Sequence, residues 1–196
     1  MIKFVKGLIN ILLCKFLYRV EYINKEQEEN CSRCIICANH SNIFEPTWIY
    51  AKTNNLYIMA KAELFKNKII AKIFNYFGVF PIHRGKKDVR SLLHSINLFK
   101  NQEKVKLLIF PEGTRIGKTS KKGNAKVGPL YIAYKACVPI VPVYITKNVP
   151  LFAHVKIIYG EPITITKDIA ADKEKLSEFS NNILEKIYSL KDYECK

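Results

Sequence analysis

A histidine and a carboxylate five residues apart are the first candidates for chemistry in this chain. His40 follows the short apolar run of residues 35–38, and Glu45 stands directly before Pro46. Such a run is typical of a buried strand, so the imidazole is expected at the carboxyl end of that strand. Proline is favoured in the first turn of a helix, which places Glu45 at a helix N-terminus. The carboxylate can then hold one imidazole nitrogen while the other accepts a substrate proton, which predicts general-base catalysis.

A second group of residues indicates an anion site. Residues 106–110 form another apolar run, and residues 111–115 read as the loop at its exit. Between positions 115 and 126 the chain carries no acidic residue but five basic ones, namely Arg115, Lys118, Lys121, Lys122 and Lys126. Arginine presents a planar fork of donors to phosphate oxygens, and the glycines at positions 113, 117 and 123 let the backbone approach an anion closely. The pattern predicts a phosphate-binding loop.

Two further apolar runs end in a cation. Lys61 ends the run of residues 57–60, and Arg84 follows residues 79–82. Taken singly, each is most simply a solvated surface charge. If the four runs lie side by side in one parallel sheet, however, His40, Lys61, Arg84 and Arg115 meet at the edge where such sheets bind ligands.

Together these segments resemble the PlsC-like 1-acyl-sn-glycerol-3-phosphate acyltransferases. The family's Asn-His-x4-Asp block appears as residues 39–45, its Lys-x-Glu-Leu-Phe block as residues 61–65, and its Gly-to-Arg block as residues 78–84. Residues 110–115 match its Phe-Pro-Glu-Gly-Thr-Arg block, and residues 138–143 match its proline-bracketed apolar strand. The likeness covers residues 30 to 160 or so. One departure stands out, because Glu45 occupies the place of the family's aspartate.

The resemblance implies acyl transfer from a thioester to the sn-2 hydroxyl of lysophosphatidate. It makes His40 the general base and Glu45 its orienting carboxylate. Phosphate binding falls to Lys61, Arg84 and Arg115, and contacts to the glycerol fall to Glu112, Gly113 and Thr114. The expected partners are lysophosphatidate and either acyl-CoA or an acyl carrier protein. Neither a metal nor a cofactor is expected, because a base and an oxyanion donor suffice for this reaction.

Length and order of segments predict one α/β domain. The chain has 196 residues, 48% of them hydrophobic, and no linker or repeat divides it. Apolar runs alternate with segments of helical period, such as residues 126–136 and 176–190, which indicates a mostly parallel central sheet flanked by helices. We expect residues 23–196 to form the acyltransferase domain.

Residues 1–22 are expected to form a separate amphipathic helix at the membrane surface. Their longest uncharged run, residues 7–14, is far shorter than the ~20 residues that span a bilayer. On a helical wheel Lys3, Lys6 and Asn10 share one side, and the other side is apolar, with Ile2, Val5, Leu8, Ile9, Leu12 and Phe16. This pattern predicts a peripheral or monotopic protein at the cytoplasmic face of the membrane. A helix packed against the core is the open alternative.

The charge and the cysteines narrow the choice of partners. The formal net charge is +15, yet the sequence carries no nucleic-acid-binding signature, so an anionic membrane surface and phosphate-bearing substrates explain the charge better than nucleic acid does. Cys31, Cys34 and Cys37 have the spacing of part of a metal motif, but no nearby cysteine completes it. Free thiols fit a cytoplasmic setting.

Two functions of other classes remain open at this stage. Residues 113–119 resemble a P-loop nucleotidase motif, but three residues separate the glycines where the motif needs four. The second alternative is a catalytically silent lipid- or membrane-binding module, because Glu45 replaces the aspartate that the family usually carries. An activity assay separates the silent module from the acyltransferase, and only tight binding of Mg-ATP would support the nucleotidase.

Overall fold

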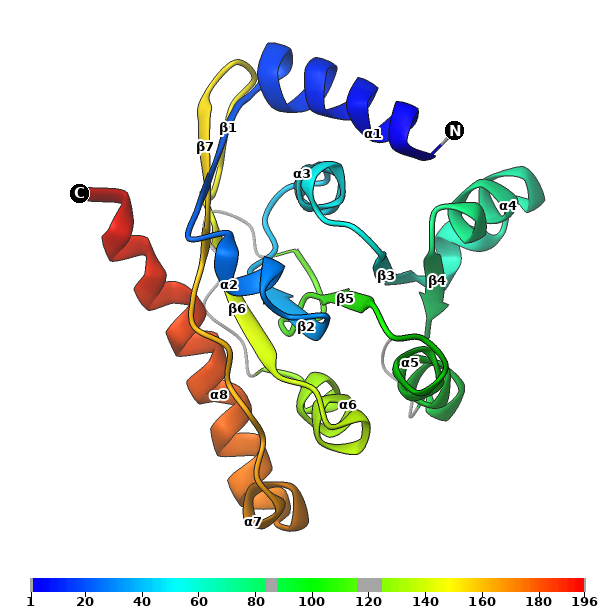
Figure 1. Ribbon diagram of the computed structural model, residues 1–196, viewed down its shortest axis with the longest axis vertical. Coiled ribbons are helices and arrows are strands. Elements are labelled where there is room, and N and C mark those ends of the chain that lie inside the picture. The colour runs from blue at the N-terminus through cyan, green and yellow to red at the C-terminus, as the bar shows by residue number, and fades with distance from the viewer. Residues whose placement is uncertain (1, 84–87, 116–124, 196) are drawn as a thin grey trace.

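The computed structural model describes residues 2–83, 88–115 and 125–195, and it is built on a mixed sheet (Figure 1). In the described part of the chain the sheet has seven strands in the order β1-β7-β6-β2-β5-β3-β4. Their bounds are Arg19–Ile23 (β1), Arg33–Ala38 (β2), Leu56–Lys61 (β3), Val79–Ile82 (β4), Val105–Ile109 (β5), Ile140–Ile145 (β6) and His154–Tyr159 (β7). Strands β6, β2, β5, β3 and β4 are parallel, whereas β7 runs antiparallel to β6 and β1 runs parallel to β7. The expected α/β fold with a mostly parallel sheet is confirmed.

Helices cover both faces of the sheet. One face carries α1 (Ile2–Ile9), the π-helix η1 (Asn10–Leu17) and α3 (Glu45–Lys52), and α4 (Lys68–Tyr76) lies at its β4 end (Figure 1). The other face carries α5 (Val89–Asn101), α6 (Gly128–Ala136) and α8 (Lys173–Ser189). The remaining short elements are α2 (Glu26–Glu29), the 3-10 helix η2 (Ala62–Phe65), α7 (Lys167–Ala171) and the 3-10 helix η3 (Leu190–Cys195).

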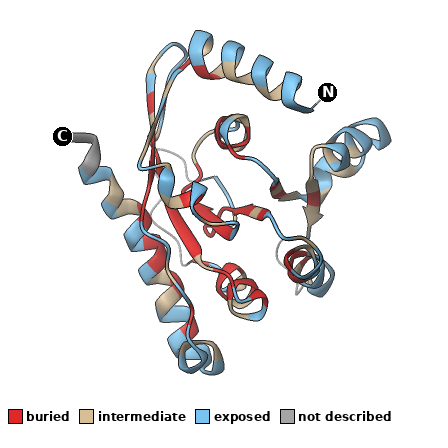
Figure 2. Cartoon of the chain, in the orientation of Figure 1, coloured by how far each residue is buried: buried red, intermediate tan, exposed pale blue. Residues whose placement is uncertain are grey.

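The central strands are apolar throughout because both of their faces are covered. In β2, Ile35 and Cys37 join the core beneath α5, α6 and α8, while Cys34 and Ile36 join the core beneath η1 and α3. Figure 2 shows burial concentrated in these strands and in the inner sides of the helices. The exits of β2 and β5 are therefore fixed from both sides.

The N-terminal helical segment is shorter than expected, and the side of it that faces the protein includes a lysine of the predicted polar side. It ends at Leu17, and Arg19–Ile23 form strand β1 along β7, so the sheet begins before residue 23. Lys6 is half-buried against α3: its ammonium donates to the Thr53 carbonyl oxygen and lies 4.5 Å from the centre of the Tyr50 ring. The helix thus packs on α3 through a stripe that includes Lys6 and the buried Cys14, and it exposes apolar side chains on its outer side. No helix of the described residues is long and apolar enough to cross a membrane.

Candidate active site

The carboxyl ends of the parallel strands place most of the predicted residues on one edge of the sheet. β2 pairs with β5, and β5 pairs with β3, so His40, the loop after Ile109 and Lys61 follow neighbouring strands. Open α/β sheets bind their ligands at this edge. The sequence prediction that these segments share an edge is confirmed.

His40 and Glu45 are in direct contact. His40 Nδ1 lies 2.6 Å from Glu45 Oε2, and a carboxylate oxygen accepts, so the ring N–H donates at Nδ1. This bond leaves Nε2 as the ring nitrogen that can take a proton. Glu45 is fully buried at the start of α3 and also accepts from the backbone N–H groups of Ser41 and Asn42, each at 2.9 Å. The longer glutamate side chain thereby closes the turn as well as reaching the ring.

Two neighbours fix the position of the imidazole. Phe110 stacks on the His40 ring, with 4.0 Å between ring centres and an angle of 21° between planes. The side chain of Asn39 forms two hydrogen bonds with the backbone of Ile145 on β6, one donated at 2.9 Å and one accepted at 2.7 Å. The exit of β2 is therefore tied to β6 while the ring rests on the β5 loop.

Glu112 connects the two sequence motifs. Its Oε2 accepts from the backbone N–H of His40 at 2.9 Å, and its Oε1 accepts from the hydroxyl of Tyr188 on α8. Burial raises the pKa of Glu112, although these hydrogen bonds and the nearby Lys147 oppose the shift. Burial, followed by the bond to Glu112, raises the pKa of Tyr188. Both carboxylate oxygens are thus engaged within the protein. The family resemblance placed Glu112 beside the substrate glycerol, and this stays a prediction.

The backbone after Glu112 makes a turn that requires glycine. Gly113 has φ +74°, a left-handed conformation that side chains strain. A Cβ at this position would also lie 3.4 Å from Cε of Lys126, whose stem packs against the turn. Thr114 and Arg115 follow on the surface. The turn therefore presents Gly113 and Thr114 side by side with Lys126.

A mostly apolar cleft of about 970 Å³ begins at this turn. Glu112, Gly113, Thr114 and Lys126 line one part of it, and its apolar lining includes Met59, Leu92, Ile109, Tyr131, Ile132 and Leu176. Phe110 also lines the cleft while it stacks on His40. The proposed base therefore lies directly behind the wall of a cavity that can hold a hydrocarbon chain.

The structure brings together only part of the predicted cation cluster. Lys61 is half exposed at the end of β3, with its ammonium 3.2 Å from Glu63, and Arg115 is exposed after β5. Arg84 and the lysines at positions 118, 121 and 122 lie outside the described residues. Lys126 was part of the predicted basic run. Its contact with Gly113 could not be predicted, because no sequence pattern links the two positions.

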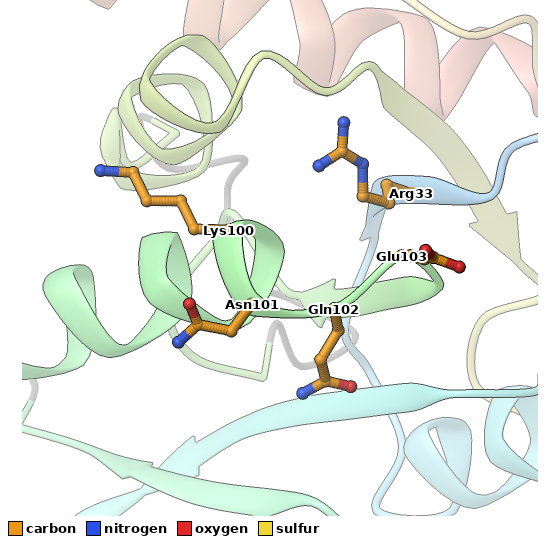
Figure 3. Close-up of a pocket in the computed structure, with 5 residues that line it drawn as sticks. All are labelled: Arg33, Lys100, Asn101, Gln102 and Glu103. Carbon is orange, nitrogen blue, oxygen red and sulfur yellow. The ribbon is translucent and has the colours of Figure 1, made fainter.

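A second, polar pocket lies at the opposite edge of the sheet. It measures about 410 Å³ and is lined by Arg33, Lys100, Asn101, Gln102 and Glu103 (Figure 3). Arg33 begins β2 and donates to the Phe99 carbonyl oxygen at 3.0 Å, so this pocket is remote from His40. Among the described residues, no group of three histidine, cysteine or acidic side chains could hold a metal ion, and Cys34 and Cys37 point to opposite faces of the sheet.

The chain is similar to known acyltransferases. A family model described as Acyltransferase matches residues 19–146, and the chain belongs to that family, among the PlsC-like 1-acyl-sn-glycerol-3-phosphate acyltransferases. This membership does not support a P-loop nucleotidase.

Relatives of known name support this assignment. The 1-acyl-sn-glycerol-3-phosphate acyltransferase of Bacillus subtilis is 30% identical over 187 residues, which cover 88% of each chain. The Streptococcus pneumoniae enzyme of the same name is 28% identical over 191 residues, or 92% of this chain and 69% of that protein. The crystal structure of PlsC from Thermotoga maritima matches all of this chain and 82% of its own, with a TM-score of 0.71 and 23% identity, and it shows the fold alone.

Proposed function

We propose that the protein transfers a fatty acyl group from a thioester to the sn-2 hydroxyl of 1-acyl-sn-glycerol-3-phosphate, which yields phosphatidate. The names of the relatives support this acyl acceptor. The observation that carries the proposal is the contact of His40 with Glu45 behind the wall of the apolar cleft. A base beside a site for a hydrocarbon chain is what acylation of a lipid alcohol requires.

In the proposed mechanism His40 Nε2 takes the proton of the sn-2 hydroxyl as its oxygen attacks the thioester carbonyl. The Glu45 carboxylate, 2.6 Å from Nδ1, stabilises the imidazolium that forms. Collapse of the tetrahedral intermediate breaks the carbon–sulfur bond, and the leaving thiolate takes the proton from the imidazolium. The base is thereby restored without a covalent acyl-enzyme.

We assign binding of the acceptor's phosphate to Lys61, Arg115 and Arg84, the last of which lies outside the described residues. Lys126 joins them because it lines the cleft beside Gly113. Gly113 and Thr114 would contact the glycerol. Glu112 lines the same part of the cleft and also supports His40, since its carboxylate accepts from the backbone N–H of the histidine.

The acceptor is an amphiphile, so the enzyme must reach it at a membrane surface. The outer side of α1 and η1 exposes Phe4, Leu8, Ile11, Leu12 and Phe16, and basic residues lie among them. Such a helix lies in the membrane interface and is attracted by anionic lipid. We propose peripheral attachment at the cytoplasmic face, where acyl-CoA or an acyl carrier protein supplies the thioester.

The decisive experiment measures transfer by the purified protein from labelled acyl-CoA and acyl carrier protein to lysophosphatidate. His40→Ala should lower turnover by roughly 10²–10⁴-fold, because it removes the general base. His94→Ala is the matched control, since His94 is exposed on α5, on the other face of the sheet, and should keep full activity. Wild-type protein that binds vesicles but transfers no acyl group would favour the silent lipid-binding module. Undiminished turnover by His40→Ala would refute the mechanism.

A further inference from the structure

Helix α4 presents an apolar stripe to its surroundings. No residue of α4, all nine of which are described, is buried. Ile69, Ile73 and Tyr76 recur at i, i+4 and i+7 and are 72%, 49% and 47% exposed. Ile70 and, in the preceding η2, Leu64 are exposed as well. Apolar residues grouped on one face of a surface helix indicate an interaction site.

The contacts that position α4 come from its cap and its aromatic residues, including Tyr76 at the end of the stripe, which meets Phe77 edge-on at 5.1 Å. Asn67 caps the helix by accepting from the backbone N–H groups of Ile69 and Ile70. Phe74 packs edge-on against Phe65 of η2, with 5.4 Å between ring centres. The helix is thus positioned by its cap and its inner aromatic side, and the isoleucines remain available for a partner.

The charges around the stripe match an anionic lipid surface. Residues 61–76 contain four lysines and a single acidic residue, Glu63. Lys66, Lys68 and Lys72 are exposed beside the isoleucines. Long lysine side chains can extend from the apolar boundary to lipid phosphates, so this combination is typical of helices that lie in a membrane interface.

Side-chain contacts through α3 link α4 to the N-terminal helix, and η2 adjoins the active-site edge. Tyr50 of α3 lies under Lys6 of α1 at 4.5 Å and meets Phe77, the residue after α4, at 6.1 Å. In Figure 1, α1, α3 and α4 lie on the same side of the sheet. η2 follows the carboxyl end of β3, which is the edge that carries His40. Ile43, in the turn between His40 and Glu45, is 63% exposed.

We propose that η2 and α4 form a second membrane-binding element, which inserts Ile69 and Ile73 into an anionic bilayer and, with α1 and η1, holds the active-site edge against the lipid. The inference deepens the proposed function, because the acceptor is a lipid of that bilayer. An acidic protein partner is the other candidate. The bilayer fits better, since exposed apolar side chains occur on helices at both sides of α3 and, at Ile43, in the turn of the proposed base.

A vesicle-binding assay that needs no turnover tests the proposal. Ile69→Ser/Ile73→Ser should weaken co-sedimentation with phosphatidylglycerol vesicles at least about tenfold, because two partly inserted side chains lose their transfer free energy. Leu93→Ser is the matched control: Leu93 is 52% exposed on α5, on the other face of the sheet, and its replacement should leave binding unchanged. Equal binding by both variants and the wild type would overturn the proposal, and a change in oligomeric state alone would assign the stripe to self-association.

A fluorescent probe at position 69 gives a second test that does not depend on loss of vesicle binding. The chain's single tryptophan, Trp48, is fully buried, so a new tryptophan at an exposed site reports its own environment. Ile69→Trp should be quenched by lipids brominated on the acyl chain, whereas Leu93→Trp should not. Absence of quenching in Ile69→Trp while the protein is bound to vesicles would exclude insertion of α4. Because neither assay involves acyl transfer, each result stands whatever the catalytic activity.

Discussion

At the scale of single residues, Glu45 performs two tasks that can be separated. Its carboxylate bonds to the His40 ring and also accepts from the backbone of the turn. Glu45→Gln keeps the shape but removes the charge that stabilises the imidazolium, so turnover should fall by ~10-fold or more. Glu45→Asp shortens the reach, and because the turn is built around the longer side chain, we expect a loss of activity there too. Steady-state kinetics of both variants test this expectation. If the glutamine variant kept wild-type turnover, Glu45 would serve only to hold the turn.

Arg115 can be tested by the choice of acceptor. It is exposed after β5, so Arg115→Ala should leave folding unchanged. If its guanidinium binds the phosphate, the variant should lose about tenfold or more in kcat/KM with lysophosphatidate but little with a monoacylglycerol acceptor. Lys100→Ala, at the opposite edge of the sheet, serves as the control. Equal losses with both acceptors would show that Arg115 does not act on the phosphate.

At the scale of elements, α8 supports the site through Tyr188. Its hydroxyl donates to Glu112, which in turn holds the His40 backbone. Tyr188→Phe should lower kcat several-fold with little change in KM, and it should cost about 1.5–3 kcal/mol of stability for a hydrogen bond to a charged group. Tyr134→Phe on α6 is the control. A raised KM with unchanged kcat would show that Tyr188 contacts the substrate instead.

The same contact predicts how stability depends on pH. Burial raises the pKa of Glu112 above its ordinary 4.5, so the native state binds this proton more tightly than the unfolded chain does. Its contribution to stability is therefore present below pH 4.5 and is lost as the pH rises through the raised pKa. Tyr188→Phe removes a bond that favours the carboxylate, which should extend this loss to higher pH. Urea unfolding at a series of pH values measures it, and identical profiles for variant and wild type would contradict the coupling.

The sequence predicted those elements whose signal is local. The apolar runs of β2 and β5 and the helical period of α8 are visible in the chain, and so is the pairing of His40 with Glu45, since five residues separate them. The link from Tyr188 to Glu112 joins residues 76 positions apart and carries no local pattern. The wheel of the N-terminal helix showed two sides but could not show that Lys6 faces Tyr50, because that depends on which element packs there.

At the scale of the whole molecule, net charge and exposed apolar side chains should act together at the membrane. With a net charge of +15, attraction to anionic vesicles is partly electrostatic, and added salt screens it over a Debye length of about 10 Å at 0.1 M. Phe4→Ser/Phe16→Ser tests the apolar part without disturbing the packing of Cys14, which deletion of the helix would expose. This variant should still bind at low salt but detach at a lower salt concentration than the wild type, as co-sedimentation across a salt series would measure. Salt-independent binding would remove the electrostatic contribution, and unchanged detachment of the variant would assign the outer side of α1 and η1 to another partner.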